Sequence, residues 1–452
     1  MTGSLGVEDA RLPGCQDPGV SAPSPPSELP AWTYLRLVLL GALIGVPAAL
    51  VAVGFLGLVH YLEHWLWVEL PEALGHSTPP WYLVLLLPVA GAVLVLAART
   101  LLPGDGGHRP LDGISVAPTP PSYGAGIALA ALATLAFGGV LGPEAPLIAL
   151  GSIVGLVVTS FARLGERERT VLSTAGSFSA ISALFGGPIV GGVLMVEGAA
   201  GLGAAALPVL LPGFVAAAVG YAIIVGFGDW GGLDVPGLAV PDLPAYEGTQ
   251  PGDLLLAVCV GVLAALLVAA VRAFATRIDG PGQARLGLPT ILLGGGAAVG
   301  ALALLADALG ASSQDVLFSG QASVPALAAE DSTRIVLVLL VAKALAYGVC
   351  LGCGFRGGPV FPAIFLGVAL ATLAVIWFDA SPTWAIAVGV AAGTAAVTRL
   401  LLTSMLFAAL LVGTGGLDAV PSAVLAASAA WVTVKALERR VHPAARPAEA
   451  GA

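Results

Sequence analysis

A single glutamate stands at the head of a long apolar stretch. Glu144 lies between Pro143 and Pro146 in GGVLGPEAPLIALGS, residues 138–152. Proline is well suited to the first helical position, so we expect a helix from about 145 to 162 with Glu144 in its first turn. Burying a carboxylate is costly unless something compensates its charge.

The compensation that this pattern predicts comes from the backbone. The first turn of a helix carries unpaired N–H groups and the positive end of the helix dipole, which together can bind an anion without any lysine or arginine. A glutamate tethered there would occupy the site when charged and vacate it when protonated or displaced. The alternative interpretation is an ordinary helix-start stabiliser, but an ionisable residue at membrane depth suggests a function.

A second glycine-proline motif, GGPVFP at 357–362, also opens an apolar helix but carries no acid. Two opposed helix starts of this kind would meet near the middle of the membrane. A permeating anion between them would be held by backbone dipoles, tightly enough to shed water and loosely enough to leave.

The elements that position these motifs are membrane helices. The chain has 452 residues, of which 58% are hydrophobic and 10% charged, whereas soluble domains have about 25% charged residues. Stretches long enough to span about 30 Å of hydrocarbon recur, and shorter ones are cut by Gly and Pro. We therefore expect an all-helical membrane domain with more than ten helices, many of them tilted or broken.

The chain also repeats itself. AGSFSAISALFGGPIVGGVLMVE (175–197) resembles VGVAAGTAAVTRLLLTSMLFAALL (388–411), and GVLGPEAPLIALG (139–151) resembles GFRGGPVFPAIFLG (354–367). Two related halves with interrupted segments at matching places are typical of transporters, with the site at the repeat interface. Shared small-residue composition is the alternative explanation, and it weakens because both pairs recur in the same order.

These features predict a domain layout and an orientation. We expect a disordered cytoplasmic tail over 1–31, a membrane domain over 32–437 in two halves (about 32–227 and 253–437), and a cytoplasmic tail over 438–452. Basic residues favour cytoplasmic loops. They cluster in three connections: Arg163, Arg167 and Arg169; Arg272, Arg277 and Arg285; Lys435, Arg439 and Arg440. Both termini are thus predicted to be cytoplasmic.

With these motifs together, the chain resembles the CLC family of chloride channels and proton/chloride antiporters. GPEAP (142–146) is similar to the motif that carries the family's gating glutamate, GGPVFP is similar to its GGxFxP motif, and 175–197 is similar to a helix pair that ends in a glutamate. The resemblance implies a homodimer with one pore in each subunit and two inverted halves. It assigns gating to Glu144 and anion binding to backbone amides around Gly142, Glu144, Ala145, Val360 and Phe361.

Several positions depart from the family pattern. The serine that the family offers to the anion is replaced by Asp112 in LDGIS, unless Ser115 substitutes for it. Pro143 and Pro359 each remove one N–H donor. The family's pore tyrosine comes from the late helices, but the last tyrosine here is Tyr347. An inner hydroxyl gate is then missing or supplied by a residue such as Thr403 or Ser404.

Other charged residues are weaker candidates. Glu197 is a candidate proton relay, although it falls one residue before the family's inner glutamate, and the alternative is a helix-end acid held by backbone N–H groups. Lys343 is expected to snorkel or to pair with an acid. Arg356 is expected to raise the potential at the external mouth, and Arg399 to be structural or lipid-facing. Cys350 and Cys353 have a redox or metal spacing, but their apolar setting favours small buried residues.

The predicted function is transport of chloride or a similar small anion across the cell (inner) membrane, with Glu144 as the gate. Exchange for protons and passive conduction both remain open, with a tilt to a passive or weakly coupled pathway. Alternatives are another anion, a non-conducting scaffold or sensor, and a transporter of an organic substrate. We expect no enzyme activity, no cofactor, no metal and no nucleic acid; the expected partners are the anion, protons, lipid and a second subunit.

Overall fold

The computed structural model describes residues 30–161, 164–199, 207–231, 240, 243–246 and 248–441. Most of the two predicted tails, residues 1–29 and 442–452, lies outside these ranges. The second tail was expected to begin at 438, but the last helix continues to Val441. α16 thus includes the first four residues of the predicted second tail, 438–441, and the end of the membrane domain stays a prediction.

Helices make up most of the described residues, in this order: α1 Ala31–His64, η1 Trp65–Glu69, α2 Leu70–Ala73, α3 Trp81–Leu101, η2 Pro110–Asp112, η3 Pro121–Tyr123, α4 Gly124–Leu135, α5 Glu144–Ser160, α6 Glu166–Leu184, α7 Pro188–Gly198, α8 Leu207–Gly231, α9 Pro251–Ala308, α10 Ser313–Val316, α11 Val324–Ala328, α12 Thr333–Cys353, α13 Val360–Phe378, α14 Pro382–Thr398, α15 Leu401–Val412, η5 Thr414–Ala419 and α16 Val420–Val441.

Among the described residues, seven helices are long and apolar enough to cross a membrane: Ala31–Ala73, Trp81–Leu101, Pro251–Gly280, Gly282–Ala308, Thr333–Cys353, Val360–Phe378 and Thr414–Arg440. Six more apolar helices, α5 and α7 among them, have only 10–17 residues. Short helices at membrane depth are tolerated where they are buried in protein or line a wet cavity. The expected class, an all-helical membrane protein with many broken helices, is confirmed.

The breaks fall where the chain must leave helical geometry. α9 bends at Gly287, whose φ of 77° lies in the left-handed region that glycine adopts easily. The break between α6 and α7 passes through Gly186, with φ 61°. The matching break between α14 and α15 uses Arg399 at φ 64°, a conformation that is uncommon for a residue with a side chain.

The predicted repeat has a counterpart in the packing. α5 lies against α6 where Gly151 meets Gly176, so closely that a Cβ on either residue would overlap the other's backbone. α13 lies against α14 in the same way, where Gly367 meets Gly389. Small residues permit such close approach of helices in membranes. Both halves thus build the same helix pair behind the glycine-proline motif.

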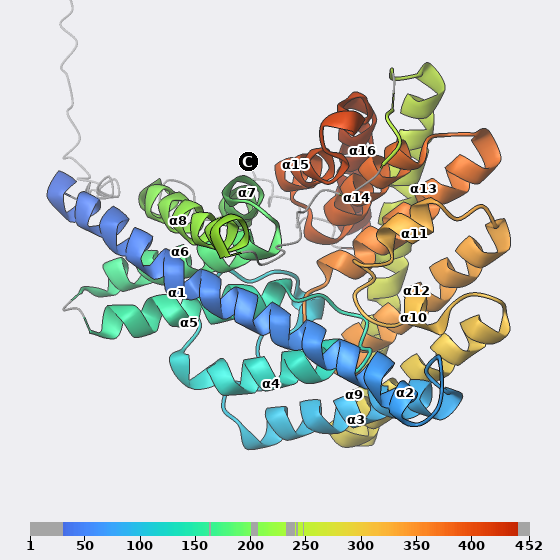
Figure 1. The fold of residues 1–452 in the computed structure, drawn as a ribbon, viewed down its shortest axis with the longest axis horizontal. Coiled ribbons are helices and arrows are strands. Elements are labelled where there is room, and N and C mark those ends of the chain that lie inside the picture. Colours follow the sequence, from blue (N-terminus) through green and yellow to red (C-terminus); the bar gives the residue numbers. More distant parts are fainter. Residues whose placement is uncertain are drawn as a thin grey trace, which may run out of the picture.

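Figure 1 shows α5 to α8 in green shades on one side and α12 to α16 in orange to red on the other. α1 runs along the first group, and α9 packs along α12, α3, α14 and α16. α7 and α15 face each other between the two groups and are in contact. This arrangement brings the starts of α5 and α13 together in the interior.

Candidate functional site

The two glycine-proline motifs, 216 residues apart, are joined by their backbones. The N–H of Gly142 donates to the carbonyl of Gly358 at 2.7 Å, and the N–H of Gly358 donates to the carbonyl of Gly142 at 2.5 Å. This pair forms an isolated antiparallel bridge. The bridge holds the first turns of α5 and α13 against each other, so neither helix start can move away alone.

The Glu144 side chain crosses from one half to the other. It is fully buried, with 0% exposure. Its Oε1 accepts hydrogen bonds from the N–H groups of Val360, at 2.9 Å, and Phe361, at 3.0 Å. These are two of the free donors at the start of α13. The acid from the first half therefore occupies the helix start of the second half.

The other carboxyl oxygen of Glu144 has a different environment. Oε2 is buried and has no hydrogen-bond partner. The carboxyl group lies over the bridge, since a Cβ built on Gly358 would come within 2.5 Å of its Cδ, and one on Gly142 within 2.6 Å. The carboxyl group can keep this position only if both residues are glycine, because a Cβ on either would take its space.

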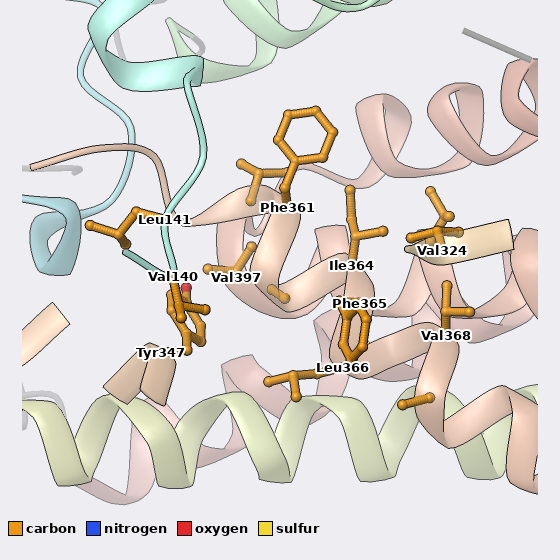
Figure 2. Close-up of a cluster of buried hydrophobic side chains, with 14 of the residues drawn as sticks. Val140, Leu141, Val324, Tyr347, Phe361, Ile364, Phe365, Leu366, Val368 and Val397 are labelled. Atoms are coloured by element: carbon orange, nitrogen blue, oxygen red, sulfur yellow. The ribbon is translucent and has the colours of Figure 1, made fainter. Parts of the chain in front are cut away.

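Tyr347 was not predicted to belong to this site. It lies on α12, is fully buried, and donates its hydroxyl hydrogen to the carbonyl of Pro359 at 2.8 Å. Figure 2 shows it in the buried cluster with Val140, Leu141 and Phe361. One signal was available in the sequence: a tyrosine in an otherwise apolar run of small residues, ten positions before the second motif begins.

Aromatic rings cover the side of the site formed by Phe361. Phe185, at the end of α6, lies 6.0 Å from the Phe361 ring. Phe407 of α15 packs edge-on against both, at 4.9 Å from Phe185 and 6.3 Å from Phe361. Rings at these distances attract one another beyond simple burial, so the interrupted helices of both halves meet around Phe361.

Two of the groups predicted to bind the anion, the Gly142 N–H and the Ser115 hydroxyl, have other hydrogen-bond partners. The Gly142 N–H was expected to face the anion, but in this conformation it donates to the Gly358 carbonyl in the bridge, so its part in anion binding stays a prediction. The Ser115 hydroxyl accepts from the Ala117 N–H at 3.4 Å, and Asp112 lies 3.9 Å from Arg109. No contact links Ser115 to Glu144, so its role, like that of Ala145, stays a prediction.

The proposed hydroxyl gate also has other partners. Thr403 donates its hydroxyl to Glu197 at 2.6 Å, and Ser404 donates to the Leu400 carbonyl at 2.5 Å. Glu197 also accepts from the N–H groups of Leu402 at 2.8 Å and Thr403 at 2.7 Å. A carboxylate at the end of α7 thus caps the start of α15.

Lys343 neither snorkels nor pairs with an acid side chain. It is fully buried on α12, and Nζ donates to the backbone carbonyls of Asp315, at 3.0 Å, and Leu317, at 2.7 Å. The ammonium group also lies 4.7 Å from the centre of the Phe365 ring, within the range of a cation–π contact. The lysine fixes the segment after α10 against α12 and α13.

Arg356 is buried and forms an ion pair. It donates to Asp105, which also binds Arg99, and these groups line a cavity of about 200 Å³ with Asp279. Asp279 belongs to the segment between Arg277 and Arg285 that the sequence predicts to be cytoplasmic, whereas Arg356 was predicted to lie at the external mouth. The two predictions conflict, and both stay predictions. Burial opposes the charge of Asp105, but the two arginines outweigh it and hold its pKa below the ordinary value.

A larger cavity opens on the other side of the Glu144 turn. It measures about 620 Å³ and is lined by Pro143, Glu63, His60 and residues 317–323, among others. Glu63 and His60 both lie at the C-terminal end of α1. Pro143, the residue before Glu144, is therefore part of the wall of this cavity.

Arg399 has a structural contact, and Cys350 and Cys353 are small buried residues, as the sequence predicted. Arg399 forms an ion pair with Glu438 at 2.5 Å, a structural contact between the α14–α15 break and α16. Cys350 and Cys353 are both buried and free, and the Cys350 sulfur accepts from the Val140 N–H at 3.2 Å.

The fold and the paired helix starts define an all-helical membrane protein whose interrupted helices converge on a buried acid. Comparison with solved structures gives the same class. A slow cyanobacterial Cl⁻/H⁺ antiporter aligns with a TM-score of 0.70 at 16% identity, covering 89% of this chain and 95% of that one. A CLC-type fluoride/proton antiporter aligns with a TM-score of 0.67 at 21% identity, covering 90% and 98%. At these identities the likeness establishes the fold.

Sequence comparison establishes the family. The family model described as voltage gated chloride channel matches residues 116–435. YfeO of Escherichia coli O7:K1, named as an ion-transport protein, is 28% identical over 356 residues, which cover 75% of this chain and 79% of YfeO. YfeO of Shigella boydii serotype 4 is also 28% identical, over 357 residues. The chain belongs to the voltage-gated chloride channel (CLC) family, as the motifs predicted.

Proposed function

We propose that this protein carries chloride or another small anion across the membrane through a pathway that Glu144 gates. One observation supports the proposal above all: the Glu144 carboxyl oxygen lies on the N–H groups of Val360 and Phe361. A carboxylate in that place satisfies the donors that a bare anion would need. The acid and the anion are thus competitors for the same two amides.

The unpartnered oxygen suggests how the gate opens. Oε2 of Glu144 accepts no hydrogen bond, so a proton can bind there without breaking an existing one. A neutral carboxyl group is attracted less by the two amides than a carboxylate. Protonation therefore weakens the hold of α13 on the side chain, and an anion can replace it.

Chloride is the first candidate anion, and fluoride is the second. The fluoride candidate comes from one structural neighbour, which is a fluoride/proton antiporter, together with the changed residues at the predicted inner site. The resemblance implies that Asp112 replaces a family serine there unless Ser115 substitutes for it. It also implies that the family's late pore tyrosine is missing or that Thr403 or Ser404 supplies its hydroxyl. A scaffold or sensor without transport is the remaining alternative.

The test is anion efflux from liposomes that contain the purified protein, with chloride and fluoride measured separately across an acid-to-neutral pH series. Glu144→Ala should raise efflux at neutral pH and flatten its pH dependence, because no acid competes for the amides. Glu144→Gln, which keeps the shape but not the charge, should act in the same direction. Wild-type efflux and pH dependence in both variants would rule out the gate, and no efflux of either anion from wild type would favour the scaffold.

Glu197 is proposed to cap α15 and not to relay protons. Its carboxyl group already accepts three hydrogen bonds from Leu402 and Thr403, which favour a side chain fixed in one position. Proton uptake during anion efflux distinguishes the two roles. A relay predicts that Glu197→Gln abolishes proton uptake while anion efflux continues, whereas a cap predicts that both change together.

Assembly and orientation are proposed on the family resemblance and on charge. We propose a homodimer in the cell membrane with both termini in the cytoplasm, and an inverted relation between the two halves. The bridge, Glu144 and both amides belong to one chain, which supports a separate pathway in each subunit. Chemical cross-linking in native membranes and labelling of tags at each terminus in intact cells test these points.

A further inference from the structure

Tyr347 lies directly behind one of the two amides that hold the Glu144 carboxyl group. We propose that it is a positioning residue for the anion site: its hydroxyl fixes and polarises the Pro359–Val360 peptide group, whose N–H binds the carboxylate or the anion. The inference rests on the proposed function, since it describes the same site. It assigns to an α12 side chain a part in anion binding that the sequence motifs did not indicate.

The geometry of one peptide group supports this role. The carbonyl of Pro359 and the N–H of Val360 belong to the same rigid plane and point in opposite directions. Tyr347 donates to the carbonyl end at 2.8 Å, and Glu144 accepts from the N–H end at 2.9 Å. The hydroxyl therefore determines the direction in which the N–H points.

The same contact also changes the strength of the donor. A hydrogen bond to an amide carbonyl draws electron density away from the N–H, and successive bonds in such a chain strengthen each other by about 10–30%. The hydroxyl of Tyr347 also offsets the partial negative charge of the Pro359 oxygen, which would repel an anion nearby. Both effects favour negative charge at the Val360 N–H.

Tyr347 is itself held firmly. Its side chain is fully buried, and Figure 2 shows it within the packed cluster that includes Val140 and Leu141. Three residues further along α12, Cys350 accepts from the N–H of Val140, in the segment that leads to Gly142. Residues three apart share a helix face, so one face of α12 contacts both glycine-proline segments.

A purely structural role for Tyr347 makes a different prediction. A tyrosine that only fills the core would contribute to folding, and its hydroxyl would have no effect on anion affinity once the protein is folded. The measurement must therefore be anion affinity of folded protein. It is best made in the Glu144→Ala background, where no carboxylate competes for the amides.

The first test removes only the hydroxyl. Chloride and fluoride binding to purified Glu144→Ala protein are measured by isothermal titration calorimetry, with and without Tyr347→Phe. Loss of one hydrogen bond should weaken anion binding about two- to tenfold. Thr372→Val is the matched control, because Thr372 also donates a buried hydroxyl to a carbonyl of α13, that of Val368 at 3.0 Å, away from the helix start.

The second test keeps both the ring and the hydroxyl of Tyr347, so it can be made even if Tyr347→Phe does not fold. 3-Fluorotyrosine, inserted at position 347 by codon suppression, has a more acidic hydroxyl and is a stronger donor. It should tighten anion binding relative to tyrosine, a change that core filling does not predict. Unchanged or weaker affinity with 3-fluorotyrosine would overturn the inference.

The outcomes separate the inference from the proposed function. If Glu144→Ala protein binds neither anion, the proposed function fails. If it binds an anion with an affinity that Tyr347→Phe leaves unchanged, or that Thr372→Val lowers equally, only the role of Tyr347 fails. Weaker binding in Tyr347→Phe alone supports the role.

Discussion

Alanine at Gly358 should open the gate without any change to the acid itself. A Cβ there would come within 2.5 Å of the Glu144 Cδ, whereas carbon atoms in contact are about 3.5–4.0 Å apart. The carboxyl group must move by about 1 Å or more to make room. Gly358 does not have a positive φ, so alanine introduces no backbone strain and the effect falls on the side chain.

The size of the effect follows from the two hydrogen bonds that the shift breaks. They measure 2.9 and 3.0 Å, and a further 1 Å takes them beyond hydrogen-bonding distance. A bond to a charged group contributes about 1.5–3 kcal/mol, so the closed position loses about 3 kcal/mol or more. Since about 1.4 kcal/mol corresponds to a factor of ten, its population should fall by about a hundredfold.

The assay is anion efflux from liposomes at neutral pH, for Gly358→Ala, for Glu144→Ala and for the double variant. Gly358→Ala should raise efflux as Glu144→Ala does, and the double variant should add nothing, because both changes remove the same competitor. Gly294→Ala is the control, since a Cβ at that position of α9 meets open space. Wild-type efflux from folded Gly358→Ala protein, or effects that add in the double variant, would refute the reasoning.

Three further predictions concern stability and are read by thermal unfolding. Glu197→Ala should destabilise the protein by about 1–3 kcal/mol, because it strips the start of α15 of its acceptor; an unchanged melting temperature would argue against the cap. Gly151→Ala and Gly367→Ala should each lower the free energy of unfolding by about 1–3 kcal/mol through overpacking. A large difference between the two variants would count against the interpretation that the two halves pack alike. Because the pKa of Asp105 is lowered in the folded protein, its carboxylate stabilises the fold fully above the ordinary pKa of 3.8. That stabilisation is lost as the pH falls through the folded pKa. Asp105→Asn should therefore remove this part of the loss of stability in acid.

The architecture could be predicted because the bilayer limits the choices. Apolar length determines which segments span, and Gly and Pro mark the breaks, so the class of fold and the helix start at Glu144 followed from local pattern. The repeat was also visible, because Gly151 and Gly367 stand at matching places. Apolar length, the Gly and Pro breaks and the repeated motifs can all be read from short stretches of the sequence, without knowing which stretches meet in the fold.

The contacts of the site could not be predicted in the same way. The pattern around Glu144 predicts a carboxylate at a helix start, but it does not show that the side chain reaches the other half. Tyr347 and Pro359 share a hydrogen bond only because α12 and the second motif fold back on each other. Arg356 pairs with Asp105, which is 251 residues away in sequence, so its position next to the second motif could not reveal its partner.

The bridge between Gly142 and Gly358 bears on how this site tolerates sequence change. Its bonds and the donors to the acid all come from the main chain of other residues. The N–H groups that Pro143 and Pro359 lack are therefore ones on which the arrangement does not depend. Drift of the surrounding side chains can then alter ion preference while the cradle keeps its shape. Divergent relatives should be easier to recognise by where glycine is obligatory than by which charged residue accompanies it.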